Sequence, residues 1–172
     1  MNYLKDKSVY LAGPIHACLD DGIGWRDAIT AKLKEYGLQV EDPCKKTIDG
    51  FGEVKDDKKL IKKLVKEEKW EEVKETFYPI VRKDLRCVDK ADFIIVYYSP
   101  LIPMFGTTAE IIESSHQKKP ILVKYDKKEL DDFNPWITCY LKSQWLFSEW
   151  DNMFKYLDKI NSGNIETSHW TL

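Results

Sequence analysis

The sequence has few cysteines, no long apolar run and no excess of one charge. Its 172 residues include four cysteines, and 27 Lys and Arg residues against 29 Asp and Glu residues leave a formal net charge of −2 at pH 7. This balance gives no general attraction to a nucleic acid polymer or to an anionic membrane. No apolar run approaches the roughly 18 residues that a membrane-spanning helix needs. We therefore expect neither nucleic acid nor membrane as a partner.

The cysteines and the N-terminal segment indicate in which cellular compartment the protein is expected. Cys18, Cys44, Cys87 and Cys139 are widely spaced, form no Cys-x-x-Cys pair and have no histidine at metal-ligand spacing. Residues 1–7 lack the apolar core of a signal peptide. Reduced thiols are typical of the cytosol, so we expect a cytoplasmic protein without a metal.

Several common catalytic motifs are also absent from the sequence. It contains no Gly-x-x-x-x-Gly-Lys loop, no Gly-x-Gly-x-x-Gly motif and no nucleophile elbow. The three histidines, His16, His116 and His169, lie in separate segments, and we expect surface or structural roles for them. No cofactor is expected, and carboxylates are the remaining candidates for chemistry.

The strongest pattern is a buried strand followed by a helix. Residues 91–98 contain six consecutive apolar or aromatic residues, typical of a strand buried on both faces of a parallel sheet. Two prolines and a glycine then end the strand, and Thr107 or Thr108 is expected to cap a helix that begins near Ala109. Glu110 would lie in the first helical turn, at the sheet edge where open α/β sheets bind ligands. The helix dipole alone also favours a glutamate there.

The other segments complete an α/β pattern. A strand, a glycine-containing loop, a helix, Gly37 and a second strand predict a right-handed βαβ unit at the start of the chain. We expect a three-layer sandwich: a Rossmann-like or flavodoxin-like parallel sheet of about four or five strands, with helices on both faces. The expected segments are strands 8–12, 38–40 and 121–125 and helices 24–36, 79–90 and 148–160.

Residues 1–172 are expected to form a single domain with two additions. The segment of about 50–76 is dense in Lys and Glu, and its apolar spacing predicts a solvated amphipathic helix over Asp57–Lys74. We interpret this segment as an insertion that covers the active site or a partner chain. Residues of about 131–172 hold four of the six tryptophans and are expected to form an aromatic C-terminal cap.

Four motifs occur in an order that resembles a known family. They are Tyr10-Leu-Ala-Gly-Pro14, Trp25-Arg26, Asp84 ahead of Ala91-Asp92, and Gly106-Thr-Thr-Ala-Glu110. Together they resemble the nucleoside 2-deoxyribosyltransferase superfamily, which also contains deoxynucleoside 5′-monophosphate N-glycosidases and CMP hydrolases. The resemblance covers roughly residues 8–125.

Carried over by position, the resemblance implies three catalytic residues. Glu110 matches the nucleophile that attacks the anomeric carbon, Tyr10 the hydroxyl that orients it, and Asp84 the group that supports protonation of the leaving base. A carboxylate suits this step, because it stabilises positive charge on the sugar and forms an ester that a base or water displaces. Core packing of Tyr10 and a solvent-facing helix charge at Asp84 remain the alternatives. The implied substrate-binding residues are Gly13, Pro14, Ile15, Trp25, Met104, Gly106 and Thr107.

Two departures from the family bear on the substrate. Six residues before the nucleophile, transferases carry aspartate and monophosphate hydrolases serine, whereas this chain has Met104, which leaves the 5′ substituent open. The first loop also lacks the Arg-Gly-Gly run of the phosphate-preferring hydrolases. Lys45, Lys46 and Arg82 are candidate phosphate contacts.

The leading hypothesis is transfer of the sugar from a (deoxy)nucleoside to a free nucleobase. Entry of water would give hydrolysis of a nucleoside or a 5′-monophosphate instead. A nucleotide-binding sensor without turnover and a structural or partner-binding domain are the alternatives of other classes. The resemblance also implies a homodimer or higher homo-oligomer, in which a neighbour's C-terminal segment completes the site through Asn134 or Asn164.

Overall fold

A parallel β-sheet forms the centre of the protein. The computed structural model describes residues 2–15, 18–45, 54–164 and 170, without the side chains of 54–58. In this part of the chain five strands pair in the order β2-β1-β3-β4-β5, and every pairing is parallel. This confirms the expected sheet. The strands are β1 (Ser8–Ala12), β2 (Gln39–Glu41), β3 (Phe93–Tyr98), β4 (Ile121–Tyr125) and β5 (Leu146–Phe147).

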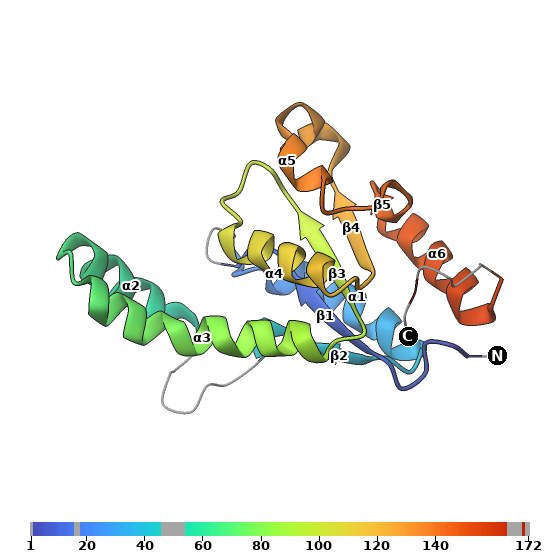
Figure 1. Ribbon diagram of the computed structural model, residues 1–172, viewed down its shortest axis with the longest axis horizontal. Coiled ribbons are helices and arrows are strands. Elements are labelled where there is room, and N and C mark those ends of the chain that lie inside the picture. The colour runs from blue at the N-terminus through green and yellow to red at the C-terminus, as the bar shows by residue number, and fades with distance from the viewer. Residues whose placement is uncertain (1, 16–17, 46–53, 165–169, 171–172) are drawn as a thin grey trace.

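Helices cover both faces of this sheet, which gives the three layers expected from the sequence (Figure 1). Along β1, Val9 and Leu11 pack with residues of α1 and α6, whereas Tyr10 and Ala12 pack with residues of α3 and α4. This alternation follows from the two-residue period of a strand. The helices are α1 (Ile23–Glu35), α2 (Val54–Lys66), α3 (Trp70–Lys90), α4 (Phe105–His116), α5 (Pro135–Thr138) and α6 (Trp150–Ser162).

The strand order reverses between β1 and β3. The chain leaves β1 through α1 toward β2, and it leaves β3 through α4, on the opposite face, toward β4. Ala12 is paired with Val96, so the loops that follow both strands emerge at the same edge of the sheet. Open α/β sheets bind ligands in the crevice at such a switch point.

The start of α4 differs from the sequence prediction. The helix begins at Phe105, Met104 is the N-cap without a side-chain hydrogen bond, and Thr107 is buried inside the first turn. The threonines therefore do not cap the helix, and Glu110 lies in its second turn. The reason is that Met104, Thr107 and Ile111 continue the buried stripe one turn upstream, and their burial outweighs local capping preferences. The effect of the helix dipole falls off within the first turn, so it does not by itself explain a glutamate in the second turn.

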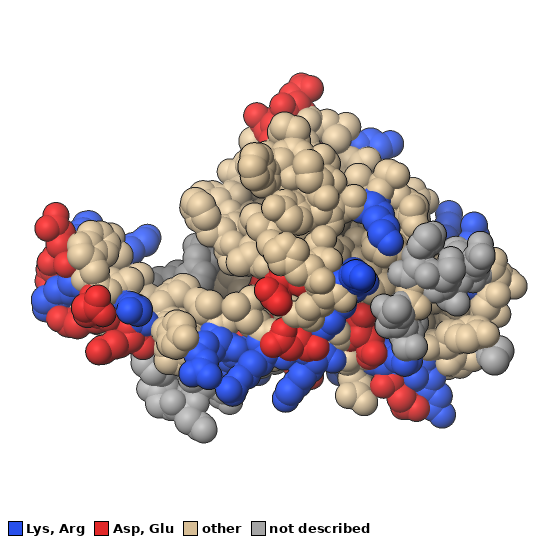
Figure 2. All heavy atoms as spheres, viewed as in Figure 1, with Lys and Arg blue, Asp and Glu red and all other residues tan. Residues whose placement is uncertain are grey.

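The charged segment also differs from the sequence prediction. The single helix expected over Asp57–Lys74 is two elements: α2 ends at Lys66, a turn follows with Glu68 at φ 55°, and α3 begins at Trp70. The helix expected to start at Pro79 instead runs straight through this proline. Packing of α3 against α2, α4 and β1 compensates for the proline's missing N–H. Figure 1 shows α2 and the first half of α3 as a hairpin that extends away from the sheet, and its acidic and basic side chains are intermixed in Figure 2.

The aromatic C-terminal segment packs on its own chain. The indole N–H groups of Trp145 and Trp170 both donate to the hydroxyl of Tyr156, at 2.8 and 3.0 Å. Trp136 is the exception, with 71% of its surface exposed. The short strand β5 was not expected from the sequence. Apart from the start of α4, the start of α3 and the charged segment, the expected segments lie within two residues of the observed ones.

Candidate active site

A buried hydrogen bond joins the middle of β1 to α4. The hydroxyl of Tyr10 donates to Oε1 of Glu110 over 2.6 Å, although the two residues are 100 positions apart in the sequence. Tyr10 is 0% exposed and Glu110 is 8% exposed. Short hydrogen bonds to a carboxylate are among the strong ones, so this bond fixes the orientation of the Glu110 side chain.

Asp84 of α3 acts electrostatically on the same tyrosine. Burial is the largest cause that raises the pKa of Tyr10 far above its usual value, and the negative charges of Glu110 and then Asp84 raise it further. The phenol therefore stays protonated and remains a donor at neutral pH. Of the three residues that the resemblance named as catalytic, Tyr10 and Glu110 are hydrogen-bonded, and Asp84 lies near enough for its charge to act on Tyr10.

Three of the expected substrate-binding residues follow β1 directly. Gly13 and Pro14 are buried and Ile15 is partly buried, at the carboxyl edge of the sheet. A Cβ at Gly13 would lie 2.7 Å from the ring of Trp25, so the ring packs directly on this glycine. Trp25 also stacks on Trp150, with ring centroids 5.8 Å apart and an interplanar angle of 11°. The tryptophan therefore belongs to the α1–α6 layer, on the opposite face from Glu110.

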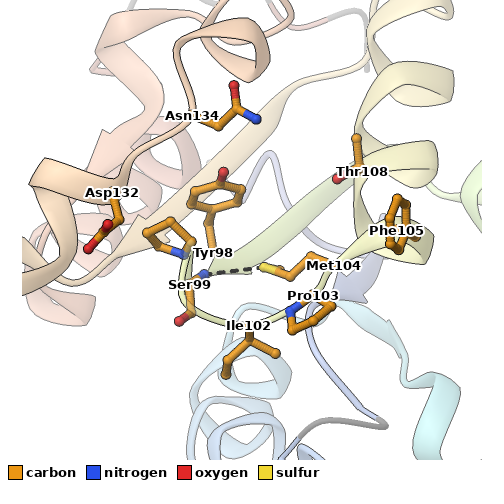
Figure 3. A pocket seen from close by; sticks show the side chains of 10 residues that line it. Tyr98, Ser99, Ile102, Pro103, Met104, Phe105, Thr108, Asp132 and Asn134 are labelled. Atoms are coloured by element: carbon orange, nitrogen blue, oxygen red, sulfur yellow. Dashed lines mark hydrogen bonds between the residues drawn. The ribbon is translucent and has the colours of Figure 1, made fainter.

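A pocket of about 420 Å³ opens beyond the carboxyl end of β3 (Figure 3). The backbone N–H of Ser99 donates to Sδ of Met104 across it, at 3.3 Å. Figure 3 shows the Tyr98 hydroxyl pointing toward Asn134, with Thr108 on the α4 side. The lining residues are Tyr98, Ser99, Pro100, Ile102, Pro103, Met104, Phe105, Thr108, Asp132 and Asn134.

The pocket lies beside the Tyr10–Glu110 pair and does not include it. Helical spacing places Thr108 and Glu110 on different sides of α4. Thr107 lies on the same side as Glu110. The buried pair is the candidate reactive centre, because it joins a buried carboxylate to a buried donor at the residues that the resemblance named as catalytic. Of the residues expected on α4, Met104 lines the pocket, whereas Thr107 and Gly106 do not.

Several lining residues were not expected from the sequence. Tyr98 and Ser99 end a central strand, and that position was a usable signal. Asn134 was expected to act in a neighbouring subunit, yet it lines the pocket of its own chain and its side chain accepts the N–H of Trp136. No sequence signal brings it there, because its position depends on α5. Asn164 is exposed just beyond the end of α6.

The described candidate phosphate contacts lie outside the pocket, and Lys46 lies outside the described residues. Lys45 pairs with Asp27 at 2.6 Å. Arg82 lies 5.6 Å from the ring centroid of Tyr78. The pocket lining includes Asp132 and no Lys or Arg.

Other catalytic chemistry finds little support. Burial raises the pKa of the Cys44 thiol to about 11, so this thiol is a poor nucleophile at neutral pH. Among the described residues, no group of three or more His, Cys, Asp or Glu side chains could hold a metal ion. In the same part of the chain, no helix is long and apolar enough to cross a membrane.

The fold and this cluster define an α/β protein with a buried, oriented carboxylate at the switch point of a parallel sheet. The structure is similar to that of a 2-deoxyribosyltransferase from the psychrotolerant bacterium Bacillus psychrosaccharolyticus, described as a biocatalyst for the synthesis of antiviral and antitumoral nucleosides. The match has a TM-score of 0.59 and 19% sequence identity, and it covers 87% of this chain and 95% of that chain. The protein thus shares the fold of this 2-deoxyribosyltransferase, which is the fold that the resemblance implied. No protein-family model and no curated protein matches the sequence.

Proposed function

We propose that the protein cleaves the N-glycosidic bond of a (deoxy)nucleoside and transfers the sugar to another nucleobase. The hydrogen bond between Tyr10 and Glu110 is the observation that carries this proposal. It orients a carboxylate near the edge where open α/β sheets bind ligands, and an oriented carboxylate is what a glycosyl nucleophile needs.

The reaction proceeds in two balanced displacements. A carboxylate oxygen of Glu110 forms a bond to the anomeric carbon while the bond from that carbon to the base nitrogen breaks. The leaving base takes up a proton that Asp84 relays from solvent, and Tyr10 holds the attacking carboxylate in place. A nitrogen of the second base then attacks the same carbon, returns a proton and releases the carboxylate. Water in place of the second base makes the protein a hydrolase.

The charge of the pocket favours a nucleoside over a nucleotide. Its lining contributes the carboxylate of Asp132 and no cation, and Glu129 lies next to it, where it accepts a hydrogen bond from Ser99. A phosphate dianion would meet negative charge there, whereas Tyr98 and Asn134 suit an uncharged hydroxyl group. The thioether of Met104 supplies apolar surface at the position where relatives carry aspartate or serine.

The resemblance leads us to propose that the protein assembles with copies of itself, and its length and its cysteines lead us to propose a single domain in the cytoplasm. Large apolar side chains at the surface support self-association: Trp70, Tyr78, Phe105 and Trp136 are each more than half exposed. Figure 2 shows a mostly uncharged surface around α4 and α5. The four free cysteines agree with a reducing compartment.

A chromatographic assay tests the proposed function. Purified protein is incubated with a panel of nucleosides and 5′-monophosphates, each with and without a second free base. We expect new nucleoside only when the second base is present, and a loss of at least about a thousandfold in Glu110→Gln. Glu113→Gln, on the same helix but outside the cluster, should retain activity.

Other results would redirect the proposal. Free base without a second base would indicate the hydrolase. Tight nucleotide binding without any turnover would indicate the sensor. Turnover that survives Glu110→Gln would contradict the covalent mechanism.

A further inference from the structure

A buried arginine binds the backbone on both sides of the loop after β1. Arg26 of α1 is 0% exposed, and its guanidinium donates to four backbone carbonyl groups. The acceptors are Gly22 O at 2.7 Å and Pro14 O at 3.5 Å from Nη1, Gly13 O at 3.0 Å from Nη2 and Leu11 O at 3.3 Å from Nε.

A carboxylate and an aromatic ring join these carbonyl groups in stabilising the buried cation. The carboxylate of Asp42 lies 3.6 Å from Nε, and the ring of Trp25 stacks on the guanidinium with its centroid at 4.5 Å. The donors of a guanidinium are spread over three nitrogens in a rigid plane, so they reach acceptors that lie too far apart for the single nitrogen of a lysine. Arg26 therefore holds three consecutive elements together: the end of β1, the loop that follows it and the first turn of α1.

The backbone at Gly22 shows how closely this loop is drawn to Arg26. Gly22 has φ +70°, and a Cβ there would lie 2.2 Å from Pro14 O and 2.6 Å from Nη1 of Arg26. No side chain fits between these atoms, so a glycine is required for the two ends of the loop to meet on the guanidinium.

We propose that Arg26 is a positioning residue for the glycosyl transfer. By binding their carbonyls, Arg26 fixes the backbone of Gly13 and Pro14 just beyond the strand that carries Tyr10, at the edge of the sheet where the sugar would bind. The proposal rests on the proposed function. The proposal is based on the position of the carbonyl groups that Arg26 binds. Those of Leu11, Gly13 and Pro14 all lie within four residues after Tyr10.

Two variants test this role in different ways. Arg26→Lys keeps the charge and removes the fork, whereas Gly22→Ala keeps Arg26 and pushes the loop off it. Gly163→Ala is the matched control, because Gly163 has φ +77° and a Cβ there would lie 2.7 Å from the Tyr3 ring, at the end of α6. Amide hydrogen exchange of the free protein is measured together with KM and kcat for the preferred nucleoside.

We expect amide exchange in segments 13–15 and 18–22 to be faster in both test variants. KM should rise about tenfold, which corresponds to the loss of one charge-assisted hydrogen bond, and kcat should stay within about twofold of the wild-type value. Gly163→Ala should lose thermal stability without either change. Faster exchange throughout the sheet in Arg26→Lys, or an unchanged KM despite faster loop exchange, would show a purely structural role and overturn the proposal. If the wild type turns over no nucleoside, the proposed function fails, and the exchange data still decide whether Arg26 orders the loop.

Discussion

The phenol of Tyr10 projects from β1 toward α4 and donates to the carboxylate of Glu110 at 2.6 Å, so β1 itself orients the candidate nucleophile. A strand is a rigid support, and a donor held in this way needs no reorganisation when the carboxylate attacks. The predictions below test this arrangement and its surroundings.

Removal of the Tyr10 hydroxyl should slow the reaction more than it weakens the fold. We expect Tyr10→Phe to lower kcat by about 10- to 100-fold, because a free carboxylate rotates away from the attacking geometry. Tyr36→Phe is the matched control, since the Tyr36 hydroxyl donates to Asp158 at 2.7 Å in the α1–α6 layer. Both variants lose a phenol–carboxylate bond worth about 1–3 kcal/mol in unfolding free energy, but only the first should lose kcat. Equal kcat values would contradict the orienting role.

The raised pKa of Tyr10 predicts a loss of stability in alkali. Burial, Glu110 and Asp84 keep the folded phenol protonated, whereas the unfolded phenol ionises near pH 10. The stabilisation is therefore complete below about pH 10, and above it the unfolding free energy should fall by about 1.4 kcal/mol per pH unit for this one group. Urea unfolding at several pH values should show a shallower alkaline decline for Tyr10→Phe than for the wild type. Parallel curves would show that Tyr10 does not contribute.

Neutralisation of Asp84 should affect catalysis through the leaving base. We expect Asp84→Asn to lower kcat by about 10²- to 10⁴-fold, the usual range for a lost proton-transfer group. Asp89→Asn, on the exposed side of the same helix, removes an equal charge and should leave kcat unchanged. A nucleoside with a base that leaves without protonation should restore much of the rate in Asp84→Asn. No such restoration would place Asp84 outside the proton path.

A charge change at the pocket should alter the response to a 5′-phosphate. Asp132 lines the pocket, so Asp132→Lys should raise kcat/KM for a 5′-monophosphate relative to its nucleoside by about five- to tenfold at low salt. Its neighbour does not line the pocket, and Asp131→Lys should give a much smaller change. Competition kinetics with both substrates measures the ratio directly. The same ratio in both variants would mean that the 5′ group binds elsewhere.

Pro79 should destabilise α3. It lies inside a 21-residue helix, where it removes one backbone hydrogen bond, so Pro79→Ala should raise the unfolding free energy by about 1–3 kcal/mol. Pro135 opens α5, where its missing N–H costs nothing, and Pro135→Ala should give no gain. Urea unfolding compares the two. A destabilised Pro79→Ala would show that the hairpin depends on a bend that the proline provides.

Much of the fold was predictable from local patterns. The apolar run before Ser99 and the βαβ pattern around Gly37 predicted buried parallel strands, because burial on both faces demands continuous apolar residues. The helix boundaries failed where tertiary packing overrode local preference. Pro79 predicts a helix start, and the turn at Glu68 has neither glycine nor proline to mark it.

The candidate site was likewise predictable from the sequence only in part. The identities of Tyr10, Asp84 and Glu110 came from motifs in the sequence alone, because their residue types and order resemble a known family. The contact of Tyr10 with Glu110 spans 100 positions, and the role of Arg26 depends on carbonyl groups that carry no sequence signal. Backbone acceptors are the same for every residue type, so only the folded chain decides which of them meet a buried guanidinium.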